Sequence, residues 1–69
     1  MKVIFLIKQI RKKENMTLKR LSQKTGISTS HLNDIENNLK QPSFEIIFRI
    51  SQALQVELNQ LYEIERKPP

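Results

Sequence analysis

The chain has 69 residues and carries a net charge of +5, so it can form one small domain whose hydrophobic core is near the minimum for folding without crosslinks. It has no cysteine, which excludes disulfides and thiolate metal sites and is expected of a cytoplasmic protein. One glycine, three prolines and many strong helix formers favour a helical domain over a β-sandwich.

The positive charge is concentrated in the first part of the chain. Up to Thr25 there are eight basic residues against the single acid Glu14, whereas from Gly26 onward six acids face four bases. A basic half favours a polyanionic partner. The apolar run Val3–Ile7 is far shorter than the roughly 20 residues that span a membrane, and it lacks a signal-peptide cleavage site, so no membrane partner is expected.

The sequence predicts an all-α domain over residues 1–65, followed by a disordered tail at 66–69. The first helix is expected from about Lys2 to Glu14, where isoleucines recur at helical spacing. The fifth and last is expected from about Glu57 to Ile64, although Glu57 is a poor N-cap.

Capping signals divide the middle of the chain. Thr17 has the chemistry of an N-cap for a helix over Leu18–Lys24, and Gly26 is suited to the left-handed conformation that ends a helix. Ser28 repeats the N-cap for a third helix. Ser43 caps the fourth, after a loop in which Asn38 is the residue expected to adopt positive φ.

Two short helices joined through a glycine, in a basic domain, are typical of a helix-turn-helix, whose second helix reads DNA. From the pattern alone, a purely structural helical hairpin remains an alternative. The third helix would turn Leu32 and Ile35 inward and leave its polar residues toward solvent.

The run Ile7–Leu61 resembles the phage-repressor and Cro-type (XRE) helix-turn-helix family, and Ser30–Leu39 is especially similar to SinR-type regulators. The matching elements are Ile10-Arg11, Met16-Thr17, Leu21-Ser22, Gly26-Ile27-Ser28, Leu32, Ile35-Glu36, Pro42-Ser43, Ile47, Ile50, Leu54, Val56 and Leu61. The resemblance implies a compact five-helix, lambda-repressor-like DNA-binding domain, with the helix-turn-helix at its second and third helices.

The chain departs from the family pattern at four positions. Leu18 stands where a glutamine usually contacts phosphate, and Glu57 stands where serine or threonine usually caps. Asn38 and Gln55 stand where glycine is frequent, and asparagine tolerates a left-handed turn better than glutamine does.

The resemblance implies that the third helix enters the major groove. The residues expected to contact bases are Thr29, Ser30, His31, Asn33 and Asp34. Asn33 can bind adenine through two hydrogen bonds, and the Thr29 methyl can touch a thymine methyl. Asp34 is equally well interpreted as a solvated charge or an ion-pair partner, and His31 as an ordinary exposed side chain. With no second histidine or cysteine, His31 is not expected to bind metal.

Phosphate contacts are expected from helix N-termini and from basic and polar side chains beside the third helix. The residues concerned are Thr17, Lys19, Ser28, Asn37 and Lys40. For each lysine, a solvated charge is the alternative. The resemblance also implies a partly buried ion pair between Arg11 and Glu36, which joins the first helix to the end of the reading helix.

The family typically places two copies on a palindromic operator in double-stranded DNA, so a homodimer is expected. Apolar residues in excess of one core are candidates for its contact, or else complete the monomer core: Val3, Phe5, Phe48, Leu61, Tyr62 and Ile64.

The predicted function is sequence-specific DNA binding as a transcriptional regulator, most simply a repressor. An antitoxin-like or adaptor module that binds another protein is the alternative. The sequence displays no catalytic cluster, and no cofactor or small-molecule ligand is expected.

Overall fold

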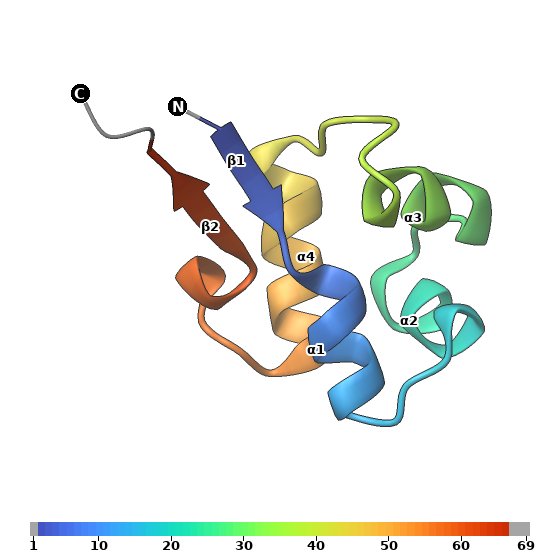
Figure 1. Cartoon of the computed structure of the whole chain (residues 1–69). Coiled ribbons are helices and arrows are strands. Elements are labelled where there is room, and N and C mark those ends of the chain that lie inside the picture. The colour runs from blue at the N-terminus through green and yellow to red at the C-terminus, as the bar shows by residue number, and fades with distance from the viewer. Residues whose placement is uncertain (1, 67–69) are drawn as a thin grey trace.

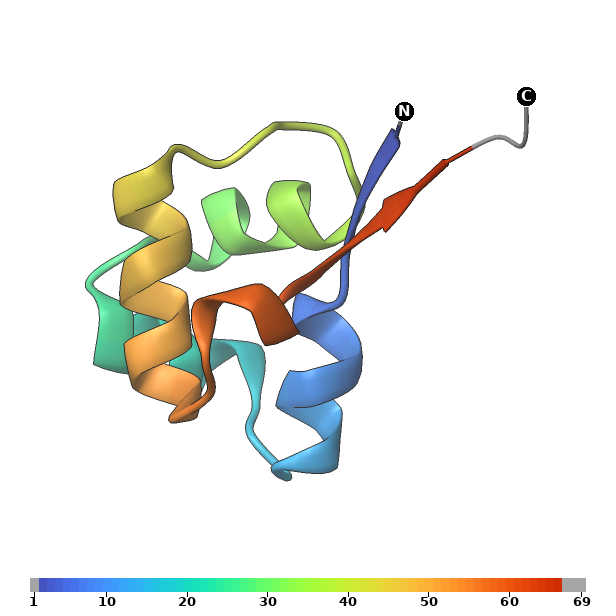
Figure 2. The same ribbon diagram turned by 90° about the vertical axis from the view of Figure 1, so that its left-hand side faces the viewer.

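The computed structural model describes residues 2–66 as a helical body with a β-ribbon beside it (Figure 1). The elements are β1 (Lys2–Phe5), α1 (Ile7–Lys13), α2 (Leu18–Thr25), α3 (Thr29–Glu36), α4 (Phe44–Leu54), the 3-10 turn η1 (Leu58–Gln60) and β2 (Tyr62–Glu65). Figure 2, at a right angle to Figure 1, shows the two strands running side by side away from the helices. Of the predicted tail, all but Arg66 lies outside the described residues.

The prediction of five helices was wrong at both ends of the chain. Residues 2–5 form β1, so the first helix begins at Ile7 rather than at Lys2. The predicted helix over Glu57–Ile64 is instead η1 followed by β2. Both strands are rich in β-branched or aromatic residues, which fit a pleated surface once a partner strand is present.

The β-ribbon, formed by β1 and β2, is antiparallel. Val3 pairs with Ile64 and Phe5 pairs with Tyr62, so these four side chains share one side of the ribbon. The Leu6 N–H continues the pairing by donating to the Leu61 carbonyl oxygen at 2.7 Å. The ribbon thereby joins the two ends of the described chain.

All three predicted hydroxyl N-caps are confirmed. The Thr17 hydroxyl accepts the Arg20 N–H at 3.0 Å, the Ser28 hydroxyl accepts the His31 N–H at 3.1 Å, and the Ser43 hydroxyl accepts the Ile46 N–H at 3.3 Å. Each bond satisfies an amide that the first helical turn leaves without an intrahelical partner.

The loops and helix ends use left-handed residues. Gly26 ends α2 with φ of 75°, as predicted, and Asn38 has the predicted positive φ, at 60°. Gln55 takes the left-handed conformation at the end of α4, with φ of 57°. At Glu57, the backbone N–H donates to the side-chain oxygen of Gln60 at 2.8 Å, which stabilises the start of η1 despite the poor cap.

The hydrophobic core lies between the helices and includes Leu61, the residue directly before β2. Its buried members are Ile7, Leu21, Ile27, Leu32, Ile35, Ile47, Ile50, Leu54 and Leu61. Leu18, at the position where the family usually has glutamine, is partly buried and packs against this core. Within residues 2–66, no helix is long and apolar enough to cross a membrane.

Substituting Gly26 separates backbone strain from steric clash. A Cβ at this position would meet no atom within 4 Å, so the cost of Gly26→Ala comes from the positive φ alone. We expect Gly26→Ala to lower the free energy of unfolding by about 1–2 kcal/mol in urea denaturation. Gly26→Asn should lose less, because asparagine tolerates the left-handed region. Equal losses in the two variants would contradict this explanation.

Candidate nucleic-acid interface

The turn between α2 and α3 is clamped by two hydroxyl groups. The Thr25 hydroxyl donates to the Leu21 carbonyl oxygen at 2.8 Å and accepts the Ile27 N–H at 3.2 Å. The Ser22 hydroxyl donates to the Ile27 carbonyl oxygen. Together with the left-handed Gly26, these bonds set the path of the chain from α2 into α3.

Thr25 is a structural residue that the sequence analysis did not single out. It is 8% exposed, and its hydroxyl bridges the last turn of α2 and the backbone beyond Gly26. The available signal was a threonine directly before the helix-ending glycine, because threonine hydroxyls commonly bond to the carbonyl four residues earlier.

The outward side of α3 carries all five residues predicted to contact bases. Leu32 and Ile35 are fully buried on the inner side. The predicted residues all keep access to solvent: Thr29, Ser30 and Asn33 are exposed, and His31 and Asp34 are partly exposed. The helix therefore presents a polar surface to solvent.

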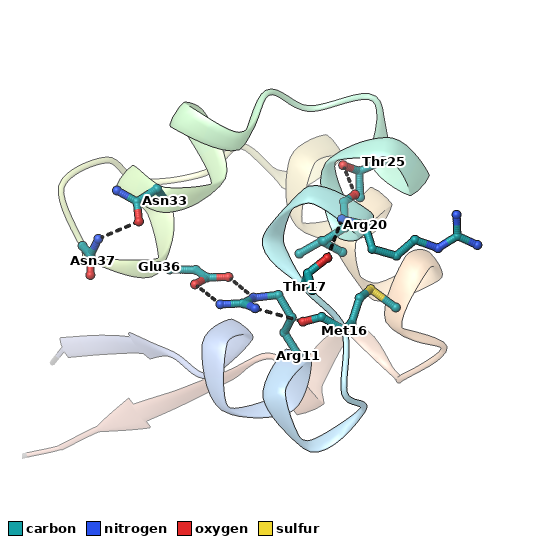
Figure 3. Close-up of polar contacts among 9 residues, drawn as sticks. Arg11, Met16, Thr17, Arg20, Thr25, Asn33, Glu36 and Asn37 are labelled. Atoms are coloured by element: carbon teal, nitrogen blue, oxygen red, sulfur yellow. Dashed lines mark hydrogen bonds and ion pairs between the residues drawn. The ribbon is translucent and has the colours of Figure 1, made fainter.

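Asn33 is oriented by a neighbour on the same helix face. The Asn37 side-chain amide donates to the Asn33 side-chain oxygen at 3.2 Å (Figure 3). The Asn33 amide nitrogen remains available as a donor, and its oxygen can accept a second bond. Asn37 had been predicted only as a phosphate contact, so this orienting contact comes from the structure.

Asp34 and Lys40 lie close together, with 3.7 Å between the Lys40 Nζ and an Asp34 carboxylate oxygen. This is the ion-pair geometry that the sequence analysis left open for Asp34. Both side chains keep solvent access, at 31% and 62% exposure, so the pair contributes little to stability. Its effect is to offset the negative charge of Asp34 on the outward side of α3.

The predicted phosphate contacts lie at the start of α2 and around α3. Lys19 lies in the first turn of α2 and is exposed. Asn37 and Lys40 lie beyond the end of α3 and are exposed as well. Thr17 and Ser28 are exposed, and their hydroxyl oxygens are occupied as N-cap acceptors. A capping hydroxyl still has its own hydrogen to donate to a phosphate oxygen.

Arg11 and Glu36 form a buried ion pair with two parallel hydrogen bonds (Figure 3). Arg11 Nε donates to Glu36 Oε2 at 2.7 Å and Nη2 donates to Oε1 at 3.0 Å. Nη1 donates to the Met16 carbonyl oxygen at 2.9 Å. The side chains of Arg11 and Glu36 are only 11% and 4% exposed.

The hydrogen bonds that Arg11 donates to Glu36, together with the negative charge of that carboxylate, raise the pKa of Arg11 above its ordinary value and outweigh the opposing effect of burial. The guanidinium therefore keeps its charge at any pH compatible with folding, and the pair joins α1, the chain before α2 and the end of α3.

A family model described as helix-turn-helix (HTH_3) matches residues 7–61. The chain belongs to this helix-turn-helix family. Among curated proteins, the HTH-type transcriptional regulator SinR of Bacillus subtilis (strain 168) is 36% identical over 58 residues, which are 83% of this chain and 52% of SinR. The resemblance to SinR-type regulators is thereby confirmed. The chain spans about half the length of the curated relatives it matches.

Solved structures give the same result for the fold. The N-terminal DNA-binding domain of SinR from Bacillus subtilis superposes with a TM-score of 0.73 at 36% identity, covering 78% of this chain and 80% of that one. SinR in complex with DNA superposes with a TM-score of 0.73 at 37% identity, covering 77% and 86% of the two chains. A helix-turn-helix built of α2 and α3 is thus common to this chain and these relatives.

Removing the Glu36 carboxylate should strongly destabilise the fold of this domain. Glu36→Ala leaves the buried guanidinium of Arg11 without its partner. We expect this to lower the free energy of unfolding by about 3 kcal/mol, because an unpaired buried charge is strongly destabilising. In a domain of this size, thermal denaturation should show the melting temperature falling by about 12–24 °C.

Glu45→Ala is the matched control for this variant. It removes an exposed ion pair between Glu45 and Arg49, four residues apart on α4, and should cost no more than about 0.5 kcal/mol. Similar melting temperatures for the two variants would contradict a structural role for the Arg11–Glu36 pair.

Proposed function

We propose that this domain binds double-stranded DNA in a sequence-specific manner and acts as a transcriptional regulator, repressing by occupying an operator. The observation that carries the proposal is the exposed polar side of α3, held by the α2–α3 turn, in a chain that shares its fold and 37% identity with SinR in complex with DNA. The relatives are named as transcriptional regulators, and we propose no enzymatic activity.

In this proposal α3 lies in the major groove, where each base pair presents a distinct pattern of donors and acceptors. Asn33, oriented by Asn37, supplies the donor and acceptor that adenine requires. Thr29 and Ser30 supply hydroxyls, and the Thr29 methyl suits a thymine methyl. Asp34 and His31 stand beside them, and Asp34 can accept a bond from cytosine.

Affinity comes mainly from neutralised phosphates, since these contacts release condensed counterions. Lys40 lies in the loop that follows α3, and Lys19 lies in the first turn of α2. Thr17 places a hydroxyl and a helix N-terminus beside Lys19 at the start of α2, and Ser28 does the same at the start of α3. The backbone contacts would set the position of α3, and its side chains would read the sequence.

Such a small module contacts few bases by itself, so we expect it to act as a homodimer on a palindromic operator. The two reading helices would then be separated by about 34 Å, one turn of the double helix. We propose that DNA binding by this domain needs no cofactor. This function agrees with the expected cytoplasmic location.

The proposal is tested by selecting sequences that the purified chain binds from a random pool of duplex DNA. Enrichment of a palindrome would support it and would report the half-site directly. If no duplex is retained at low salt, where phosphate contacts are strongest, the proposal fails and the alternative of a protein-interaction module is favoured.

Truncating Asn33 should cost specificity rather than general affinity. On the selected operator, Asn33→Ala should weaken binding by about 1–3 kcal/mol, or about 5- to 150-fold, with almost no change on a random duplex. Fluorescence anisotropy titrations measure both. Asn59→Ala, an exposed asparagine in η1, is the control. An equal loss of affinity on both duplexes would show that Asn33 does not read bases.

Lys40 should contribute a phosphate contact. Lys40→Ala should reduce the slope of log affinity against log salt by about 1, on operator and random duplex alike. Lys13→Ala at the end of α1 removes the same charge outside the helix-turn-helix and should leave the slope unchanged. An unaltered slope in Lys40→Ala would mean that Lys40 only pairs with Asp34.

A further inference from the structure

A groove of about 530 Å³ lies between β1 and the loop that follows α3. One wall is the whole of β1, and the other consists of Asn38, Lys40 and Gln41. We call it the β1 groove. Figure 1 shows the loop passing over the top of the domain, from α3 to the side that carries β1.

The polar side chains that line the β1 groove are hydrogen-bond donors. Lys2 and Lys40 carry ammonium groups, and Asn38 and Gln41 carry amides. All four residues are exposed, and no acidic side chain lines the groove. Such a lining suits an anion that is rich in oxygen atoms.

The outer edge of β1 adds backbone donors to this lining. The Leu6 N–H donates to the Leu61 carbonyl oxygen, and residues of an antiparallel ladder alternate between bonding to the partner strand and pointing away from it. The backbone groups of Val3 and Phe5 therefore point away from β2. Within residues 2–66 no second strand covers that edge, so its N–H groups can donate to a ligand.

The β1 groove is continuous with the outward side of α3. Lys40 lines the groove, and its Nζ lies 3.7 Å from a carboxylate oxygen of Asp34 on α3. A DNA backbone that contacts Lys40 would therefore meet the β1 groove next. This continuity, together with the donors of the lining, favours a nucleic-acid backbone over a peptide as the occupant.

We propose that the β1 groove binds the DNA backbone beyond the base pairs that α3 reads, with Lys2 as the phosphate contact. This inference rests on the proposed function and enlarges its contact surface. The match to the helix-turn-helix family begins at residue 7, so β1 is additional to the part of the chain that the family shares. The apolar atoms of β1 suit the C–H surface of the deoxyribose between two phosphates.

The acids of β2 decide which strand faces the DNA. Glu65 is the strand partner of Lys2, and Glu63 lies on the same side of the β-ribbon. Their carboxylates repel phosphate, and neither of them lines the β1 groove. The backbone is therefore bound at the edge of β1, with β2 turned away from it.

The inference is tested by varying the length of DNA beside one half-site of the selected operator. One duplex is trimmed to the base pairs that α3 reads, and the other is extended past the Lys40 contact. For the wild-type chain, the extension should steepen the slope of log affinity against log salt by about 1. Lys2→Gln removes an exposed charge, so it should abolish this increase and leave binding to the trimmed duplex unchanged. Fluorescence anisotropy measures all four titrations.

Three further variants serve as controls. Lys2→Arg keeps the charge and should keep the increase in slope. Lys13→Ala removes a positive charge outside the helix-turn-helix and should keep it as well. Glu65→Gln removes the negative charge opposite Lys2 and should tighten binding to the extended duplex.

The outcomes separate this inference from the proposed function. An extension that adds nothing for the wild-type chain, or an increase that survives in Lys2→Gln, would overturn the role of the β1 groove. The groove would then be left to an extended peptide that pairs with β1. A wild-type chain that binds neither duplex at low salt would overturn the proposed function itself, and this inference with it.

Discussion

The three hydrogen bonds of the Arg11 guanidinium are the constraint on which the reading helix depends. They tie α1 to Glu36 at the end of α3 and to the Met16 carbonyl just before α2. A buried ion pair adds little net stability, because desolvation offsets its attraction, but it penalises every arrangement that separates the partners. Here the ion pair fixes the position of α3, because a shift of α3 along the domain would leave the charged guanidinium of Arg11 without its partner.

The opposite side of α3 is arranged with weaker, exposed contacts. Asn37 holds the amide of Asn33, and Lys40 stands beside Asp34, so two of the five candidate base contacts already have intramolecular partners. Such partners reduce the conformational freedom that binding would otherwise take from these side chains. In the proposed complex, a phosphate that attracted Lys40 would compete with the carboxylate of Asp34 for it.

The domain therefore carries its polar, basic and apolar surfaces on different elements. The outward side of α3 is polar, the segment that ends with α2 is basic, and the groove lined by Val3, Phe5, Phe44 and Tyr62 is apolar. Pro42 lines this groove two residues after Lys40, so the groove lies next to the loop that carries Lys40.

Features that depend on neighbouring residues were predictable from the sequence: the hydroxyl caps at Thr17, Ser28 and Ser43, the left-handed Gly26 and Asn38, and the inward Leu32 and Ile35 of α3. Each is a matter of one turn of backbone, where side-chain chemistry acts directly. The strands β1 and β2 were not predictable in this way, because each takes its conformation from a partner at the other end of the chain. The Asn33–Asn37 and Asp34–Lys40 contacts likewise needed the structure, since spacing admits such pairs but only the packed helix and loop bring their atoms within reach.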